Sequence, residues 1–257
     1  MANCLKGWSK NEIFSKTFVP PETSFFVRLD GWRFRALSED IGAEKPFDER
    51  FALCLVNSSK TLFKKGLNPT LVYVVSDELN ILFDDTAPFN GRIEKIDSIM
   101  SSLISSSFSL QLQRFFDKKV AAAFDSRIII AKNDEKIMEY LTWRQVNAWR
   151  NHNNAYAYWL FRKMGYKPSE IAKKLKGIKA EEIHELLFEH GVNLSKTPQW
   201  QRRGILIHKK PYQKKIADQR VTRWKITENW DLPLFSSEEG IKLIRQILEW
   251  MRQKRRT

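Results

Sequence analysis

Three acidic residues stand at the ends of apolar segments, in a pattern that suits a site for divalent cations. Asp30 ends the segment SFFVRLD and precedes Gly31, and Asp77 and Glu78 separate the runs LVYVV and LNILF. If the first segment lies beside a hairpin formed by the other two, Asp30 and Asp77 meet at the edge of a sheet. Two aspartates held that close repel each other unless a cation lies between them. The pattern predicts bound Mg²⁺ that shares substrate phosphates as ligands, as in two-metal attack at phosphorus.

The same residues have a simpler interpretation. Ser and Asp are common turn formers, so Ser76-Asp77-Glu78 by itself favours an exposed polar hairpin turn. The choice between a turn and a metal site depends on the rest of the chain.

The composition is that of a globular protein. With 257 residues, 42% of them hydrophobic, the chain can bury one sizeable core, or one core and a smaller lobe. It has no run of ~18 apolar residues, and its first twenty residues lack the apolar stretch of a secretory signal. Cys4 and Cys54 cannot form a disulfide framework, and the histidines have no partner at metal-ligand spacing. We therefore expect a soluble, cytoplasmic protein with no membrane partner.

The charge is strongly basic and unevenly distributed. The net charge is +14, and residues 201–257 contain 15 Lys and Arg but only 6 Asp and Glu, a local net charge of +9. A basic tail can simply aid solubility, but a whole-chain excess of this size favours a nucleic-acid partner.

The first half of the chain alternates strands and helices. A helix is expected to start at Pro46 and to end before Gly66, by its apolar spacing and its terminal residues. The expected strands are 24–30, 71–75, 79–83 and one within 121–132, and a second helix covers 92–116. The order predicts an α+β fold, with an antiparallel sheet that carries helices on one face.

The second half predicts a helical lobe followed by a hairpin. Thr142 and Gln145 fit a capping box that opens a long helix, and Ser236 with Glu239 caps a last amphipathic helix. Two short helices are expected at 167–177 and 180–191, and strands 204–210 and 220–227 form a hairpin with a basic connection. We expect a catalytic domain at 1–140 and a second domain at 141–257, made of this lobe, the hairpin and the last helix.

Several motifs together resemble one family. They are VRLDGWRF, KPFDERF, SDELNILF, AAFDSRIII, YLTWRQ and WQRRGILI, in that order between residues 20 and 210. Their order and spacing resemble those of tRNA(His) guanylyltransferase and its like-proteins, which polymerise nucleotides in the 3′ to 5′ direction. The resemblance implies a palm-like catalytic sheet, two Mg²⁺ ions, ATP or GTP as activating and substrate nucleotides, and nucleotide addition to the 5′ end of tRNA.

The resemblance also assigns residues. Asp30 and Asp77 match the metal-binding aspartates, the carbonyl of Gly31 matches a further ligand, and Glu78 matches a neighbouring catalytic acid. The residues at the family's triphosphate-binding positions are Arg28, Lys45, Ser76, Arg92 and Lys95. Basic side chains and a hydroxyl are groups that a triphosphate needs besides metal. Without the motifs, Arg28 would be a surface strand position, and Arg92 and Lys95 a solvated helix face.

Two departures from the family pattern bear on function. Trp32, followed by Arg33, stands where the family commonly has an arginine, and Trp149 replaces the histidine of the eukaryotic signature. With Arg150 and Asn151 next to it, the stretch WRNHNNA looks like that of archaeal and bacterial like-proteins. For these the resemblance implies template-dependent repair of truncated tRNA 5′ ends. We rank this repair first, and G addition to tRNA(His) alone second.

The expected partners are tRNA and nucleoside triphosphates. Arg150 and Asn151 are candidates for holding the tRNA 5′ end, although two polar helix faces explain them equally well. Basic residues near aromatics after position 200 suit shape-based binding of duplex RNA: Arg202, Arg203, Lys209, Lys210, Lys214 and Lys215. The family resemblance also implies a homodimer or homotetramer.

Two interpretations from other classes stay open. A nucleotidyl or diguanylate cyclase shares the palm-like fold and two metal-binding aspartates, but its Gly-Gly-Asp/Glu-Glu-Phe turn is absent here. A tRNA-binding protein without catalysis is the other, and intact Asp30, Asp77 and Lys45 argue against it.

Overall fold

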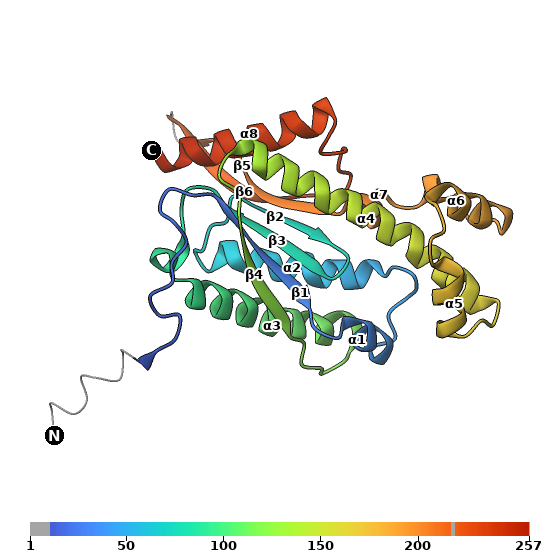
Figure 1. Cartoon of the computed structure of the whole chain (residues 1–257). Helices are drawn as coiled ribbons and strands as arrows, with labels where there is room; N and C mark the ends of the chain where they lie inside the picture. The colour runs from blue at the N-terminus through green and yellow to red at the C-terminus, as the bar shows by residue number, and fades with distance from the viewer. Residues whose placement is uncertain (1–10, 217–218, 257) are drawn as a thin grey trace, which may run out of the picture.

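A six-stranded antiparallel sheet forms the centre of the computed structural model, which describes residues 11–216 and 219–256 (Figure 1). Its strand order is β4-β1-β3-β2-β5-β6. The strands are β1 Phe25–Gly31, β2 Leu71–Val75, β3 Glu78–Phe83, β4 Phe124–Ile130, β5 Ile205–Ile216 and β6 Gln219–Asn229. The α+β class and the antiparallel sheet expected from the sequence are confirmed.

The central strands are buried on both faces. Every residue of β2 and β3 is buried, because successive side chains point to opposite sides of a strand and both sides are covered. Leu79 and Ile81 pack into one core, whereas Tyr73 and Leu82 pack into a second core on the other face.

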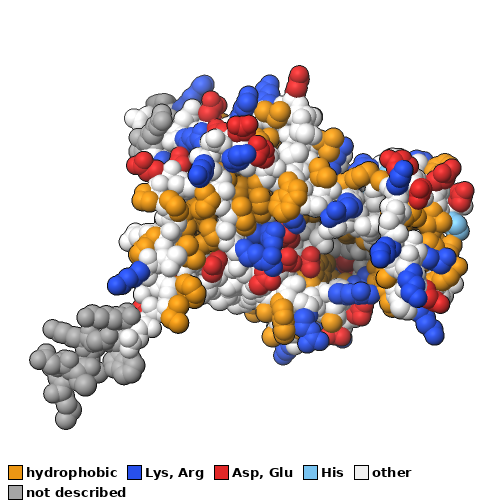
Figure 2. Space-filling model, in the orientation of Figure 1, with side chains coloured by type: hydrophobic (Ala, Val, Ile, Leu, Met, Phe, Trp, Pro, Cys, Tyr) orange, Lys and Arg blue, Asp and Glu red, His pale blue; other side chains and the backbone are white. Residues whose placement is uncertain are grey.

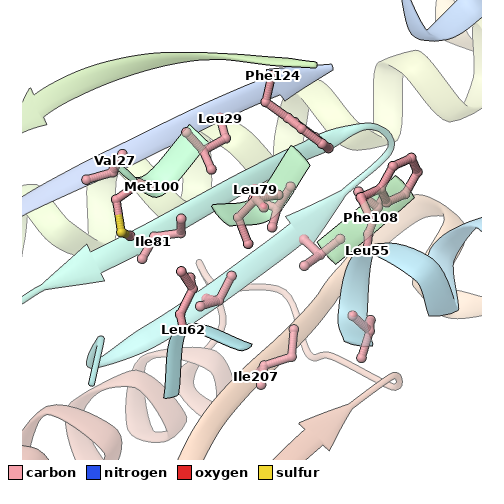
Figure 3. Packing of buried hydrophobic residues seen from close by; sticks show 14 of the residues in the cluster. Val27, Leu29, Leu55, Leu62, Leu79, Ile81, Met100, Phe108, Phe124 and Ile207 are labelled. Atoms are coloured by element: carbon pink, nitrogen blue, oxygen red, sulfur yellow. The ribbon is translucent and has the colours of Figure 1, made fainter. Parts of the chain in front are cut away.

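The first face carries α2, Glu49–Lys64, and α3, Ile93–Phe116. Figure 3 shows Leu55 and Leu62 of α2 and Met100 and Phe108 of α3 against apolar side chains of the sheet. All four side chains are fully buried. At about 1.5 to 3 kcal/mol per buried side chain of this size, such contacts hold the helices on the sheet.

The second face carries α4, Asp134–Lys163, and α8, Glu238–Arg256. Figure 1 shows both helices on the side of the sheet opposite α2 and α3. The sequence interpretation placed helices on one face only, and the C-terminal part covers the other. The physical reason is that Phe26, Leu71 and Leu82 make this face apolar as well. The expected boundary between 140 and 141 lies inside α4, and the two-domain division stays a prediction.

Helix starts were the least accurate part of the sequence interpretation. α2 begins at Glu49 rather than Pro46, because the Asp48 carboxylate accepts the N–H of Arg50 and caps the helix. α4 begins eight residues before the expected Thr142 cap, because Asn133 caps it through the N–H of Lys136. At the start of α8, Ser237 rather than Ser236 accepts the N–H of Gly240.

The remaining elements are short helices at the two ends of the sheet and beside α4. α1, Phe34–Asp40, follows β1 directly and was not expected from the sequence. α5, Pro168–Leu175, and α6, Ala180–Glu189, pack on the C-terminal half of α4 (Figure 1). Short 3-10 helices cover Pro88–Gly91 and Leu194–Lys196, and α7 covers Gln199–Arg203. None of the described helices has the length and hydropathy needed to span a bilayer.

Candidate active site

β1 and β3 bring the predicted carboxylates together. The two strands are antiparallel neighbours, and Asp30 pairs with Glu78 in the register. The backbone N–H of Gly31 donates to the carbonyl oxygen of Asp77 at 3.2 Å, which ties the end of β1 to the turn before β3. The expected placement of the first strand beside the hairpin is confirmed. Because β1 and β3 lie in the middle of the sheet, the carboxylates meet at strand ends and not along an edge strand.

Asp77 lies in an environment that disfavours its charge. Burial, and then the neighbouring charge of Asp30, raise the pKa of Asp77 to about 6. The side chain of Ser76 donates a hydrogen bond to Asp77, which offsets only part of this effect. Within the described residues, neither Asp30 nor Asp77 forms an ion pair with Lys, Arg or His. The pair therefore has a negative charge that no side chain of this part of the chain neutralises.

Gly31 is required by packing at this turn. A Cβ atom on Gly31 would lie 2.3 Å from the ring of Phe34, a distance that real Cβ atoms do not reach. The ring of Phe34 stacks on Phe108 and contacts Phe124 edge-on, so it cannot easily move away. Only glycine allows α1 to pack this closely behind Asp30. This packing requirement holds whether or not the Gly31 carbonyl binds a metal ion.

Glu78 differs from the two aspartates because basic and amide side chains bind its carboxylate. Arg144 of α4 donates two hydrogen bonds to its carboxylate, one of them from Nε to Oε1 at 2.8 Å, and Asn80 donates another at 2.8 Å. The Nε of Arg28 is 3.8 Å from Oε2. Burial still raises the pKa of Glu78 above its usual value despite the charge of Arg144. Glu78 is therefore the anchor of a buried polar network, and its catalytic assignment stays a prediction.

The two aspartates suit part of a magnesium site. Oxygen ligands on a pair of unneutralised, repelling carboxylates are what a hard divalent cation requires. The described residues contain no group of three or more His, Cys, Asp or Glu side chains able to hold a metal ion. Any ion held by Asp30 and Asp77 would therefore complete its ligand shell with backbone carbonyls, water or substrate phosphates.

A cavity of about 280 Å³ opens beside Asp77. α1, the loop before α2, the hairpin turn, α4 and α7 all contribute to its wall, and Figure 2 shows a hollow beside the lobe that contains α5 and α6. Four residues predicted from the sequence line it: Lys45, Ser76, Asp77 and Asn151. The fold thus joins residues from three separate stretches of the chain in one cavity.

Lys45 is positioned by aromatic and polar neighbours. Its ammonium group lies 5.7 Å from the ring centre of Trp159 and donates to the hydroxyl of Ser38. Burial lowers the pKa of Lys45 below its usual value. No carboxylate lies within ion-pair distance of Lys45 in the described part of the chain. Its positive charge therefore remains available to an anion in the cavity.

The structure does not bring all the predicted phosphate ligands to this cavity. Arg28 lies on the face of the sheet that α4 covers, next to Glu78. Arg92 and Lys95 lie at the start of α3. The backbone of Arg92 forms an isolated β-bridge with Phe18, and its guanidinium donates to the carboxylate of Glu94. This is the opposite end of the sheet from the hairpin turn (Figure 1). The triphosphate assignments of Arg28, Arg92 and Lys95 stay predictions.

The basic residues proposed for RNA fall into two groups. Arg202 and Arg203 are half-buried and donate to the carbonyls of Leu194 and Leu232 at 3.1 and 2.9 Å. Lys209 is half-buried and donates to Asn68. The exposed residues are Lys210, Lys214 and Lys215 on β5, and Arg150 on α4.

The hairpin of β5 and β6 opposes like charges across its strands. Lys210 pairs with Lys225, and Lys215 pairs with Arg220. Directly opposed like charges weaken a strand pair, so their presence favours a polyanion that binds over them.

Two residues near the cavity were missed by sequence reasoning. Arg144, which donates to Glu78 and balances its charge, lies within the YLTWRQ motif, and the motif assigns it no separate role. His152 lines the cavity, is buried, and bonds to Thr197 at 3.0 Å. Burial lowers the pKa of His152 to about 4, so it is neutral at physiological pH. Neither role has a signal in spacing, because both depend on contacts between distant segments.

Comparisons with known proteins find similar sequences over most of the chain. The family profile described as tRNAHis guanylyltransferase matches residues 9–132, and the Thg1 C terminal domain matches residues 135–240. The chain is 34% identical to the tRNA(His) guanylyltransferase of Candida glabrata over 200 residues, 74% of this chain and 84% of that protein. It is 33% identical to the tRNA(His) guanylyltransferase of Saccharomyces cerevisiae over 220 residues, 82% of this chain and 92% of that protein.

Solved structures show the same fold. The crystal structure of the Saccharomyces cerevisiae tRNA(His) guanylyltransferase matches with a TM-score of 0.71 and 26% identity, over 85% of this chain and 95% of that one. A bacterial Thg1-like protein in complex with ATP matches with a TM-score of 0.74 and 24% identity, over 96% of this chain and 98% of that one. The chain belongs to the tRNA(His) guanylyltransferase family, whose members are nucleotidyltransferases.

Proposed function

We propose that the protein adds nucleotides to the 5′ end of tRNA in the 3′ to 5′ direction, with the opposite strand as template. Support comes from the paired but unneutralised Asp30 and Asp77 beside a cavity that contains Lys45. The names of the relatives add tRNA as the substrate class, and the resemblance of the motifs implies its 5′ end. Family membership also argues against the nucleotidyl cyclase alternative.

The reaction has two steps. In the first, an oxygen of the tRNA 5′-monophosphate attacks the α-phosphorus of ATP or GTP, and pyrophosphate leaves; a 5′-triphosphate needs no such activation. In the second, the 3′ hydroxyl of an incoming nucleoside triphosphate attacks the activated 5′ phosphorus. A new P–O bond forms, the bond to the nucleoside monophosphate or pyrophosphate breaks, and the hydroxyl proton passes to solvent.

The residues divide these tasks. Asp30 and Asp77 would hold two Mg²⁺ ions, which when bound lower the pKa of the attacking hydroxyl and neutralise the leaving phosphate. Lys45 and Ser76 face the same cavity and would bind triphosphate oxygens. Watson-Crick pairing to the opposite strand would select the base, so no base-specific pocket is needed at the reaction centre.

General repair of truncated 5′ ends is the preferred activity. It rests on Trp149, which stands where the eukaryotic signature has histidine, in a stretch that resembles that of the archaeal and bacterial like-proteins. Addition of a single G to tRNA(His) is the second candidate, favoured by the names of the similar proteins.

The test is extension of 5′-monophosphorylated tRNAs that lack one or two 5′ nucleotides, with Mg²⁺ and all four triphosphates. The variant is Asp77→Asn, and the matched control is Asp40→Asn, an exposed aspartate at the end of α1. We expect extension that follows the opposing base, is lost in Asp77→Asn and is retained in Asp40→Asn.

Other outcomes decide between the alternatives. Addition of one G to tRNA(His) alone would favour the second candidate. Binding of tRNA without any addition would leave a non-catalytic tRNA-binding protein and refute the proposal. Extension that survives in Asp77→Asn would refute the assignment of the metal site.

A further inference from the structure

A second cavity, of about 380 Å³, lies on another side of α4. Its wall comes from α4, α7 and the loop before α8, and it includes Val146, Trp149, Arg202, Arg203 and Leu234. α7 separates the two cavities: Trp200 and Gln201 line the first, and the next two residues line the second. A single bound molecule of sufficient length can therefore contact both.

The floor of this second cavity is built from tightly bonded polar groups. The side chain of Gln145 donates to the carbonyl of Pro233 at 3.1 Å and accepts the N–H of Phe235 at 2.7 Å. Its amide also donates to the carbonyl of Arg203 at 3.3 Å, and the hydroxyl of Tyr73 donates to the same carbonyl at 2.9 Å. These bonds fix α4, α7 and the loop relative to one another, so the cavity is preformed.

The wall exposes apolar surface. Val146 is 59% exposed, Leu234 48% and Trp149 41%. Single exposed apolar residues are common, but three around one concave site with an indole ring form a surface for a flat apolar group. Among the residues that the structure describes, the ring of Trp149 has one aromatic neighbour, His184, whose ring centre is 5.9 Å away.

The same wall contains two arginines without a direct ion pair, and the charge of Asp231 acts on Arg202 only from a longer distance. No carboxylate lies within 4 Å of Arg202 or Arg203 in the part of the chain that the structure describes. One hydrogen bond joins each guanidinium to a backbone carbonyl, and the buried Nε of Arg202 has no acceptor. Two adjacent guanidinium groups with unused N–H donors attract a phosphate.

An indole surface next to paired guanidinium groups matches one kind of ligand best, an unpaired nucleotide. Unpaired bases stack on aromatic side chains, while their phosphates bind Arg, and neither contact needs a particular base. The 3′ strand of a tRNA is unpaired next to the 5′ end, and a 5′ truncation lengthens that unpaired segment. We infer that this cavity binds an unpaired nucleotide of the substrate's 3′ strand, with its base on Trp149 and its phosphate on Arg202 and Arg203.

This inference rests on the proposed function and deepens it. The 5′ end would occupy the cavity at Asp77, and the 3′ strand would continue past α7 into the second cavity. Holding the part of the 3′ strand beyond the templating base here would leave that base free to pair with the incoming nucleotide. Trp149 would thus replace the histidine of the eukaryotic signature with a base-stacking side chain that is indifferent to sequence.

The test compares two RNA hairpins with the same stem, one blunt and one with a three-nucleotide 3′ overhang. Binding to the full chain is measured by fluorescence anisotropy. Each stacked base should contribute about 5- to 100-fold in affinity, so the overhang tightens binding of the wild type by that factor. Trp149→Ala should abolish this gain without changing binding of the blunt hairpin, and Trp149→Phe should retain most of it.

Trp143→Ala is the matched control, because Trp143 is also exposed on α4, at 51%, but does not line the cavity. It should keep the full gain. An overhang gain that persists in Trp149→Ala would overturn the inference, and so would an equal loss for the blunt and overhang hairpins.

Binding and catalysis separate the two proposals. Asp77→Asn should still show the overhang gain. A wild type that shows the gain but never extends tRNA would refute the proposed function and leave this inference standing. A wild type that extends tRNA, with an overhang gain that Trp149→Ala does not reduce, would support the proposed function and refute this inference.

Discussion

Asp77→Asn should stabilise the protein in the absence of divalent cations, although it should abolish activity. Asn has nearly the same shape as Asp but carries no charge. The substitution removes the repulsion with Asp30 and the cost of keeping a charged group half-buried. Substitutions at most polar sites destabilise or do nothing, so an increase in the free energy of unfolding would be specific to this site.

The magnitude follows from the pKa of Asp77. Its rise from 3.8 to about 6 corresponds to about 3 kcal/mol at pH 7 and above. Asp77 is partly exposed, so solvent screening reduces the expected gain to about 1 to 2 kcal/mol. Below pH 4 both the folded and the unfolded chain hold the proton, and above pH 6 both lose it. Between these values the folded chain alone stays protonated, so the free energy of unfolding should fall as the pH rises from 4 to 6.

The assay is urea unfolding at pH 4.5, 6 and 7.5 in EDTA, with wild type, Asp77→Asn and the exposed control Asp40→Asn. We expect Asp77→Asn to be more stable than the wild type at pH 7.5. Its free energy of unfolding should not decrease between pH 4 and 6, whereas that of Asp40→Asn should decrease as in the wild type. Added Mg²⁺ should stabilise the wild type and not Asp77→Asn, because bound metal removes the same repulsion. The reasoning is refuted if Asp77→Asn is equal to or less stable than the wild type at pH 7.5 in EDTA.

The remaining predictions concern buried carboxylates that have partners. Arg144→Met should lower the free energy of unfolding by about 3 to 5 kcal/mol, because it leaves Glu78 buried without its cation; urea unfolding should show that Glu78→Gln in the same chain recovers part of the loss. Arg252→Ala should lower stability by about 2 kcal/mol at pH 7, because Arg252 donates to the fully buried Asp84 at 2.9 and 3.0 Å. Burial raises the pKa of Asp84, but hydrogen bonds from Arg252 and Ser24 outweigh this effect and hold the pKa below its usual value. The loss of stability in Arg252→Ala should therefore shrink as the pH falls below about 4. An undiminished loss at pH 3 would contradict the argument.

The sheet and the carboxylate site could be predicted because their signals are local. The β-branched and apolar runs around Asp77 mark two strands, and the acidic pair marks their junction. The start of α4 could not be found in the same way. Thr142 and Gln145 fit a cap in sequence, but Asn133 caps the helix nine residues earlier and the helix continues through Thr142. Cap signatures indicate where a helix can begin, not which of two candidates is used.

The contacts around the site could not be predicted, because they join segments that are distant along the chain. Glu78 and Arg144 are 66 residues apart and meet only because α4 crosses the face of β3. The second cavity has the same origin, since Gln145 and Phe235 are 90 residues apart. Side-chain types narrow the possible roles of such residues, and the fold alone decides which of them touch.

The treatment of buried acids across the fold argues for the site more strongly than any single motif. Asp48, Glu78 and Asp84 are the buried acids of the described chain, and arginine binds each of them. Asp77, whose charge is disfavoured by burial and by Asp30, has no such partner in these residues. A chain with 44 Lys and Arg could supply one easily. Leaving this carboxylate unneutralised costs stability, and that cost is understandable if a cation and its bound phosphates complete the site during the reaction.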